Sequence, residues 1–220
     1  MDESLPVKTL RDGVRRYERQ VRAHYTEKYA RLADGQTPQA LLVTCCDSRL
    51  VPNLIASTDP GDLFIIRNVA NLVPPALDGE ACSDASVSSA LWYAVEVLEV
   101  PEIIVCGHSS CGGIKALLAP IPYGDLQRWL APAAPALRIW REKGPLDASF
   151  AEHDQLSRLA TLQQIEHLQT YAFVQKRVAS GSLRLGAWWF DIPTGRTLVH
   201  SPAEGRFTYD FADRESLIAC

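Results

Sequence analysis

Three short, largely apolar segments constrain the fold of this chain more than any other feature of its sequence. They are "ALLVTC" (40–45), "LFIIRNV" (63–69) and "EIIVCG" (102–107). Each is shorter than a typical helix, and none alternates regularly between polar and apolar residues. This pattern is typical of strands that are buried on both faces of a parallel sheet. We therefore predict three parallel strands at the centre of an α/β fold.

The segment between the second and third predicted strands has the pattern of a crossover helix. It covers residues 84–100, with Asp84 or Ser83 as a candidate N-cap and Pro101 directly after its end. A strand, a helix and a strand in this order predict a right-handed connection between parallel strands.

The second half of the chain adds helices and a hairpin. Residues 151–179 are predicted to be helical, and residues 182–192 and 196–201 are predicted to pair around a turn at Gly195. The predicted fold class is α/β. Its mostly parallel central sheet has four or five strands, of which the last is antiparallel, and helices flank the sheet.

Residues 8–33 form a predicted amphipathic helix among many charged residues. With 220 residues and 47% hydrophobic content, the chain can bury one sizeable core, and no linker or internal repeat divides it. We predict a single domain, 1–220, in which residues 1–34 form an N-terminal helical arm. The sequence supports equally that this arm packs on its own domain and that it packs across a dimer interface. Its apolar positions are Leu10, Val14, Tyr17, Val21 and Tyr25.

Charge and hydropathy exclude several classes of partner. The net charge is −4 and the chain has no basic stripe or block, so neither nucleic acid nor an anionic membrane surface is expected to be a partner. Charged residues or prolines interrupt every apolar run before it could span a membrane. The first twenty residues are charged throughout and lack the apolar core of a signal peptide. We therefore expect a cytoplasmic protein with reduced thiols.

The predicted strands end at chemically active side chains. "CCDSR" (45–49) ends the first strand and "HSSC" (108–111) follows the third. Carboxyl ends of parallel strands meet at one edge of a sheet, where ligands commonly bind. His108 and Cys111 are spaced i, i+3 on a turn into a helix, so both can face one centre. Two thiolates and one imidazole suit zinc and leave a fourth position for water or substrate.

Two features of the first motif follow from strand geometry. In an extended segment Cys45, Asp47 and Arg49 face one way and Cys46 faces the other, which favours Cys45 as the ligand only weakly. Asp47 could accept a hydrogen bond from metal-activated hydroxide, and Arg49 could hold Asp47 through a charge-assisted fork. Asp47 and Arg49 share a face only if the segment stays extended.

The chain resembles the β-class carbonic anhydrases. The two zinc motifs of that family, C-x-D-x-R and H-x-x-C, match 45–49 and 108–111, and the strings at 64–75 and 107–118 are also similar. The resemblance covers roughly residues 35–200. It implies reversible hydration of CO2 to bicarbonate and a proton by zinc-bound hydroxide, which an Asp-Arg dyad orients. It implies one zinc ion per chain on Cys45, His108 and Cys111, a catalytic dyad of Asp47 and Arg49, and substrate contacts from Gln36, Phe64, Tyr93 and Gly112.

The resemblance also carries expectations about regulation and assembly. Some family members close the site by moving the aspartate onto zinc, and these have a bicarbonate pocket built from Trp, Arg and Tyr. The matching positions here are Leu42, Arg67 and Phe190. Leucine and phenylalanine cannot donate hydrogen bonds, so we expect an open site and no regulatory bicarbonate pocket. The family also implies a homodimer that exchanges the arm, and assembly into a tetramer or octamer stays open.

Other interpretations compete with this one. The same scaffold could act on a CO2 analogue such as CS2, serve as a zinc-stabilised interaction module, or work as a thiol redox protein. The redox alternative predicts a low-pKa pair at Cys45/Cys46 or Cys106/Cys111. Elsewhere we expect core or surface roles: Cys106 is a core thiol, Trp188 and Trp189 pack on the sheet, and His24, His153 and His167 are solvated surface residues.

Overall fold

The structure is a computed structural model that describes residues 9–121, 123–144 and 149–209. Contacts between residues divide the chain into two compact units, Met1–Thr37 and Pro38–Cys220. The organisation as one domain with an arm therefore stays a prediction. Among the described residues, no helix is long and apolar enough to cross a lipid bilayer.

The first unit is helical, as residues 8–33 predict. It consists of α1 (Leu10–Arg16), a π-helical turn η1 (Tyr17–Val21) and α2 (Arg22–Arg31). Thr9 caps the first helix, because its side chain accepts a hydrogen bond from the backbone N–H of Asp12. None of the residues from Leu10 to Arg31 is buried.

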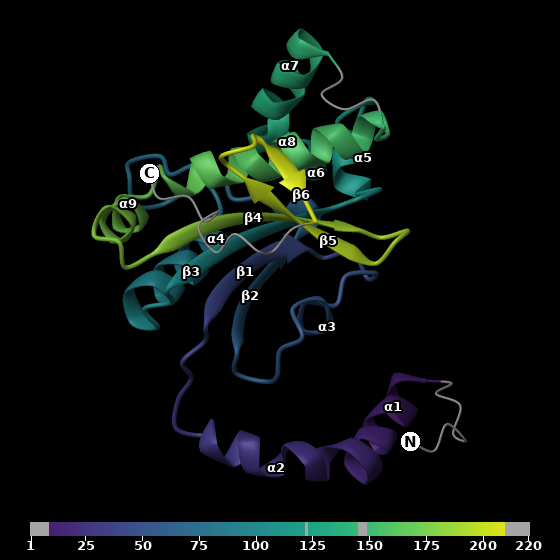
Figure 1. The fold of residues 1–220 in the computed structure, drawn as a ribbon, viewed down its shortest axis with the longest axis vertical. Coiled ribbons are helices and arrows are strands. Elements are labelled where there is room, and N and C mark those ends of the chain that lie inside the picture. The colour runs from purple at the N-terminus through teal and green to yellow at the C-terminus, as the bar shows by residue number, and fades with distance from the viewer. Residues whose placement is uncertain (1–8, 122, 145–148, 210–220) are drawn as a thin grey trace. The chain divides into compact units, whose positions relative to one another are not determined.

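The second unit is built on a mixed sheet with the order β2-β1-β3-β4-β5-β6 in the described residues (Figure 1). The first four strands in this order are parallel, and the last two pairs are antiparallel. The three strands and the hairpin predicted from the sequence are confirmed, with Gly195 at a φ of 65° in the turn. The strands are β1 (Ala40–Cys45), β2 (Leu63–Asn68), β3 (Glu102–His108), β4 (Arg184–Asp191), β5 (Arg196–Ser201) and β6 (Arg206–Thr208).

In the part of the chain that the structure describes, the sheet has six strands, where the sequence predicts four or five. β6 has three residues and follows a turn in which Gly205 has a φ of 63°. Three residues are too few for an alternating pattern to be recognised, so this strand was missed.

Helices cover the sheet and its carboxyl edge. The crossover is confirmed: Asp84 accepts a hydrogen bond from the N–H of Val87 and caps α4 (Ala85–Trp92), which the π-helical turn η3 (Tyr93–Val97) extends. The long helix α8 (Glu152–Leu168) lies against β3 and β4 (Figure 1). The remaining elements are α3 (Pro52–Ile55), η2 (Val69–Asn71), α5 (Gly112–Ala116), α6 (Gly124–Leu130), η4 (Ala131–Ala133), α7 (Ala134–Lys143) and α9 (Ala172–Ala179).

The prediction of a solvated His167 is wrong. The predicted helical segment 151–179 breaks between α8 and α9, and His167 lies on the last turn of α8, buried against the loop after β2. Its Nδ1 lies 2.7 Å from the Val73 carbonyl oxygen, and burial lowers the pKa of the imidazole. Gln164 holds the same loop, since its side-chain oxygen accepts a hydrogen bond from the N–H of Val73 at 2.8 Å. Charged residues near His167 in the sequence suggested an exposed helix surface, although the side of α8 that carries His167 is buried.

β3 approaches α8 too closely for a side chain at one position. A Cβ atom at Gly107 would lie 2.1 Å from Thr161 Oγ1 and 3.2 Å from Trp189 Cδ1. We expect Gly107→Ala to lower the free energy of unfolding by about 1–3 kcal/mol, because overpacking displaces neighbouring atoms. Chemical denaturation followed by circular dichroism measures this loss.

Thr161→Ala supplies the control, because it removes the atom nearest to the added methyl group. It also removes a 2.8 Å hydrogen bond from the Thr161 hydroxyl to the Ser157 carbonyl, so it has a cost of its own. The double variant should lose less stability than the sum of the two single variants. If Gly107→Ala costs the same in both backgrounds, overpacking against Thr161 is not the cause.

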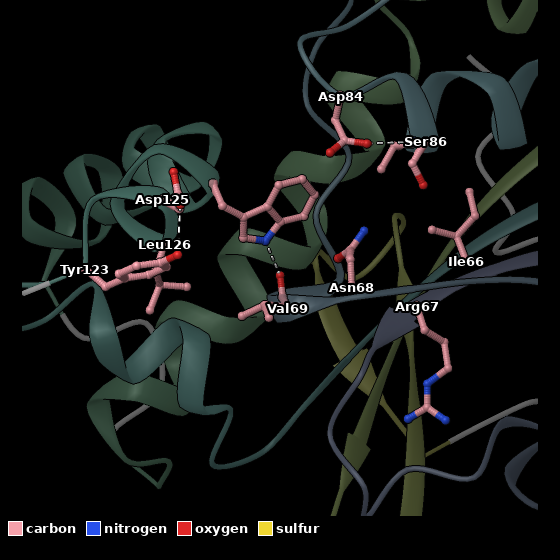
Figure 2. Close-up of a pocket in the computed structure, with 11 residues that line it drawn as sticks. Ile66, Arg67, Asn68, Val69, Asp84, Ser86, Tyr123, Asp125 and Leu126 are labelled. Carbon is pink, nitrogen blue, oxygen red and sulfur yellow. Dashed lines mark hydrogen bonds between the residues drawn. The ribbon is translucent and has the colours of Figure 1, made fainter.

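A mostly apolar pocket of about 480 Å³ opens beside β2 (Figure 2). The end of β2 forms one wall, and α6 with Trp129 forms another. The Trp129 ring is fixed by a 2.8 Å hydrogen bond from its Nε1 to the Val69 carbonyl oxygen. The lining residues are Ile66, Arg67, Asn68, Val69, Asp84, Ser86, Val87, Tyr123, Asp125, Leu126 and Trp129.

Candidate metal centre

Two neighbouring strands bring three soft donor groups to the carboxyl edge of the sheet. Cys45 is the last residue of β1, His108 is the last residue of β3, and Cys111 immediately precedes α5. β1 and β3 pair in parallel, so the two strand ends lie next to each other. The candidate ligand atoms of all three residues lie within 4.8 Å of one another, and all three residues are buried. This group could hold one metal ion.

The imidazole of His108 has the orientation of a metal ligand. Its Nδ1 lies 2.9 Å from the Ser109 carbonyl oxygen, so the N–H is assigned to Nδ1 and Nε2 carries a free lone pair. Nε2 is buried and has no hydrogen-bond partner among the described residues. An unsatisfied buried nitrogen is costly, and a metal ion would satisfy it.

The two thiols lie close enough to change each other's ionisation, as two ligands of one cation would. A hydrogen bond with the Cys111 side chain lowers the pKa of the Cys45 thiol. The same bond, together with burial, raises the pKa of Cys111. A divalent cation between them would stabilise both thiolates. Two sulfurs and one nitrogen are a donor set that fits zinc.

Cys46 is exposed and does not belong to this group, whereas Cys45 is buried in it. The backbone N–H of Cys46 donates to the Asn68 carbonyl oxygen at 2.9 Å, which continues the ladder between β1 and β2. The pairing of these two strands therefore extends one residue past the end of β1.

Asp47 and Arg49 form a two-pronged ion pair beside the group. Arg49 Nε donates to Asp47 Oδ1 at 2.9 Å, and an Arg49 terminal nitrogen donates to Asp47 Oδ2 at 2.7 Å. The hydrogen bonds from Arg49 hold the pKa of the Asp47 carboxyl well below its usual range. The side chains meet because the chain turns, with the Arg49 backbone N–H on Asp47 Oδ1 at 3.0 Å. The two side chains therefore meet without the extended segment on which the sequence argument made their contact depend, since an Asx-type turn brings them together.

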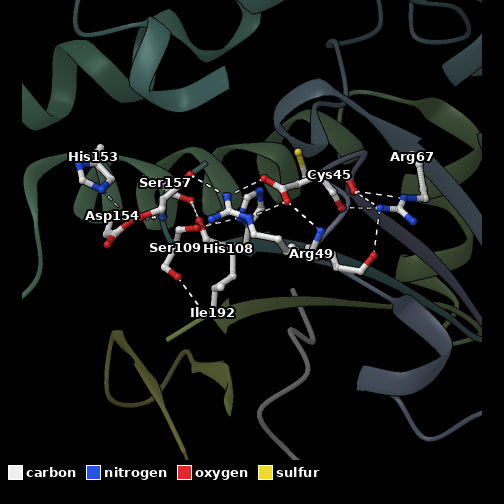
Figure 3. A network of polar contacts seen from close by, with 12 residues as sticks. Cys45, Arg49, Arg67, His108, Ser109, His153, Asp154, Ser157 and Ile192 are labelled. Carbon is white, nitrogen blue, oxygen red and sulfur yellow. Dashed lines mark hydrogen bonds and ion pairs between the residues drawn. The ribbon is translucent and has the colours of Figure 1, made fainter. Parts of the chain in front are cut away.

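Arg67 holds the turn that carries these residues (Figure 3). Its guanidinium donates to the carbonyl oxygens of Cys45, Asp47 and Leu50 at 3.1, 2.8 and 3.1 Å. From the sequence, Arg67 was matched only to one position of a bicarbonate pocket, and this role was not predicted. All three acceptors are backbone carbonyl oxygens. Every residue has a backbone carbonyl, so the sequence does not indicate which ones Arg67 contacts.

The loop between His108 and Cys111 is held from two sides (Figure 3). From β4 and the residue after it, the Phe190 carbonyl accepts from the Ser109 N–H at 2.9 Å, and the Ile192 N–H donates to Ser109 Oγ at 2.8 Å. From α8, Ser157 Oγ donates to the His108 carbonyl at 2.9 Å. The sequence located α8 but gave no sign that its polar residues contact this loop.

The predicted substrate residues are spread over the chain. Gly112 follows Cys111 directly, is exposed and begins α5. Phe64 stacks on Tyr93, with ring centroids 5.9 Å apart, near the start of β2. Phe64 precedes the strand partner of Cys45 by four residues, about 13 Å along a strand. Of the three predicted residues in the second unit, only Gly112 adjoins the metal ligands of the same chain. Gln36 belongs to the first unit and is exposed.

Comparisons of the sequence with known proteins agree with one another. A family model described as "Carbonic anhydrase" matches residues 40–197, a span that contains all three candidate ligands. A carbonic anhydrase of Pseudomonas aeruginosa is 36% identical over 201 residues, which cover 89% of this chain and 88% of the relative. A carbonic anhydrase of Synechococcus elongatus is 32% identical over 204 residues, which cover 87% and 71%.

Solved structures match the fold over nearly the whole chain. The β-carbonic anhydrase CcaA superimposes with a TM-score of 0.83 at 29% identity, covering 93% of this chain and 92% of that one. One of two tetrameric β-carbonic anhydrases from Sordaria macrospora superimposes with a TM-score of 0.75 at 30% identity, covering 90% and 96%.

Proposed function

This chain belongs to the β class of the carbonic anhydrase family, and we propose that it hydrates CO2 reversibly to bicarbonate and a proton with one zinc ion per chain. The observation that carries the zinc site is the convergence of Cys45, His108 and Cys111, whose ligand atoms lie within 4.8 Å of one another. The buried, unpartnered Nε2 of His108 supports it among the described residues. When bound, zinc supplies Lewis-acid activation of water near neutral pH.

Three protein ligands leave one corner of a tetrahedral site for solvent, as catalytic zinc sites require. Two thiolates cancel the formal charge of the ion, so it acidifies water less than it would on three neutral histidines. A site of this charge depends more strongly on a neighbouring group that orients the attacking water.

Asp47 is our candidate for that group. Its lowered pKa keeps the carboxylate ionised at neutral pH, so it can only accept hydrogen bonds. Accepting one from the attacking water turns a lone pair of the oxygen toward CO2. Arg49 holds Asp47 through two parallel bonds and donates a third, at 3.2 Å, to the Ser110 carbonyl. The carboxylate is thereby fixed in place before substrate arrives.

We propose that Gln36, Phe64, Tyr93 and Gly112 contact substrate. Glycine next to Cys111 leaves room for a small molecule, and aromatic rings suit the apolar CO2. Because Phe64 and Tyr93 lie near the start of β2 in their own chain, their contribution requires a second subunit. We therefore propose a homodimer or a larger homo-oligomer, for which the tetrameric relatives from Sordaria macrospora are a precedent. A cytoplasmic location is also proposed, supported by five free thiols among the described cysteines.

The thiol redox alternative loses support from the surroundings of the other cysteines. It predicted a low-pKa pair, Cys45/Cys46 or Cys106/Cys111. Burial raises the pKa of Cys106 to about 12 and also raises that of Cys46. The pKa of Cys45 is lowered, and its partner in that effect is the candidate ligand Cys111.

Removing the metal tests the proposed function. We expect elemental mass spectrometry to find about one zinc ion per chain in purified protein. We also expect the protein to hydrate CO2 in a stopped-flow pH-indicator assay. Dialysis against a zinc chelator should abolish hydration, and stoichiometric zinc should restore it. Protein that contains no zinc as purified, or that hydrates CO2 equally well after zinc is removed, would contradict the proposal.

A further inference from the structure

We infer that Asp154, near the start of α8, is a positioning residue for the Asp47–Arg49 pair. It acts by holding the backbone of Ser110, whose carbonyl oxygen accepts a hydrogen bond from Arg49. This inference rests on the proposed function, since it assigns Asp154 a part in the same reaction without contact to substrate or metal.

The backbone of one residue, Ser110, lies between Asp154 and Arg49, which Figure 3 shows in the same network. Asp154 Oδ1 accepts a hydrogen bond from the Ser110 backbone N–H at 2.6 Å, a short distance typical of a charged acceptor. On the neighbouring peptide group, the Ser110 carbonyl accepts from Arg49 at 3.2 Å. The Asp154 side chain is only 14% exposed, so water competes little for this contact.

The backbone at Ser110 needs such a contact. Its φ is 55°, in the left-handed region that side chains other than glycine rarely adopt. A serine there relaxes toward an ordinary backbone conformation unless surrounding bonds hold it. Relaxation would rotate the Ser110 carbonyl and remove the second anchor of Arg49.

The candidate ligands on both sides of Ser110 have supports that do not involve Asp154. The Cys111 carbonyl accepts a hydrogen bond from the Lys115 N–H at 2.9 Å in the first turn of α5. Ser157 holds the His108 carbonyl at 2.9 Å, and both the backbone and the side chain of Ser109 are bonded to the segment at the end of β4. Loss of Asp154 should therefore disturb the Asp47–Arg49 pair more than the ligand set. The expected signature is a slower reaction in a protein that still holds its metal.

Asp154→Ala removes the contact, and Asp154→Asn retains an oxygen that can accept the same hydrogen bond. We expect Asp154→Ala to lower kcat for CO2 hydration by about tenfold or more. Losses of this size are found when residues that orient the groups around a metal ion are removed. KM should change little and zinc content should stay at one per chain. Asp154→Asn should retain most of the wild-type kcat, because its amide oxygen can accept the hydrogen bond from the Ser110 N–H although the side chain carries no charge.

Asp84→Ala is the matched control. Asp84 accepts a hydrogen bond from the Val87 N–H at 3.0 Å near the start of α4, so the variant loses the same kind of contact elsewhere. It should lower stability without lowering kcat. Amide hydrogen exchange gives a readout independent of activity: exchange in a peptide that contains Ser110 should accelerate in Asp154→Ala and not in Asp84→Ala.

The outcomes separate this inference from the proposed function. Wild-type protein without hydration activity overturns the proposed function, while the exchange measurement still tests the contact of Asp154. An active wild type together with an unchanged kcat in Asp154→Ala overturns the inference alone. Loss of zinc in Asp154→Ala also overturns it, because that would make Asp154 a support of the ligands. If Asp154→Ala does not fold, Asp154→Ser, whose side chain is too short to reach Ser110, should give the same result.

Discussion

Cys45→Ser is expected to abolish both zinc retention and CO2 hydration. Cys45 supplies one of three candidate ligand atoms that lie within 4.8 Å of one another, and it is buried among them. A serine hydroxyl binds zinc poorly because it stays protonated. We expect the zinc affinity, measured by competition with a chelator, to fall by far more than about 10- to 100-fold. That smaller loss is typical when a residue that hydrogen-bonds a metal ligand is removed. Elemental analysis and stopped-flow hydration measure the two effects.

The next residue supplies the matched control. Cys46→Ser makes the same chemical change one position along the chain, where the side chain is exposed and lies outside the ligand group. Zinc content and hydration rate should both stay at the wild-type level. Equal losses in the two variants, or a larger loss for Cys46→Ser, would show that the wrong thiol has been assigned to the metal.

Asp47→Asn is expected to slow hydration by about 100-fold or more while zinc content stays at one per chain. Positioned groups that accept a proton or a hydrogen bond in the transition state contribute about 10²–10⁴ in rate. Asparagine keeps an oxygen for Arg49 but replaces the other with an amide that donates hydrogen bonds, so the attacking water loses its acceptor. Stopped-flow kinetics give kcat and KM, and elemental analysis confirms the metal.

The pH profile of the wild type sharpens this prediction. Arg49 holds the pKa of Asp47 well below its usual range, so the folded protein keeps this carboxylate ionised through neutral and mildly acidic pH. The stability that the pair contributes is present above the pKa of an unfolded aspartate and is lost as pH falls through the lower folded value. Any decline in activity between pH 8 and pH 6 must therefore come from another group.

An exposed ion pair gives the control for Asp47. Asp125 and Arg128 are paired three residues apart on α6, and both side chains are largely exposed. Asp125→Asn removes a carboxylate from a guanidinium just as Asp47→Asn does, but such surface pairs contribute little. Its kcat should match the wild type. A similar loss in both variants would mean that Asp47 acts through general electrostatics and has no special position.

The sequence was sufficient for the elements with a strong local pattern. The strands from 40, 63 and 102 were predicted to within about a residue, because burial on both faces leaves an apolar run that few other structures produce. β6 was missed because it has only three residues. The break between α8 and α9 was missed because apolar residues continue through it in the sequence.

Some residues of the candidate site could be predicted from the sequence and others could not. The three candidate ligands could be picked out because cysteine and histidine are chemically distinctive and stand at or just after the ends of neighbouring strands. Arg67 and Asp154 were not, since they act on backbone groups whose position depends on the fold. The stacking of Phe64 on Tyr93 was also beyond the sequence, because β2 and η3 meet only in the folded chain.

The inner face of α8 limits how this protein can be redesigned. Along one helix, Asp154 and Ser157 bond the ligand loop, Thr161 contacts the glycine before His108, and Gln164 and His167 bond the backbone at Val73. A designer who fills such a face with leucine to gain core packing would break these bonds one after another. Laboratory evolution toward greater heat resistance should therefore accept changes on the solvent side of α8 and reject them on the side that faces the sheet.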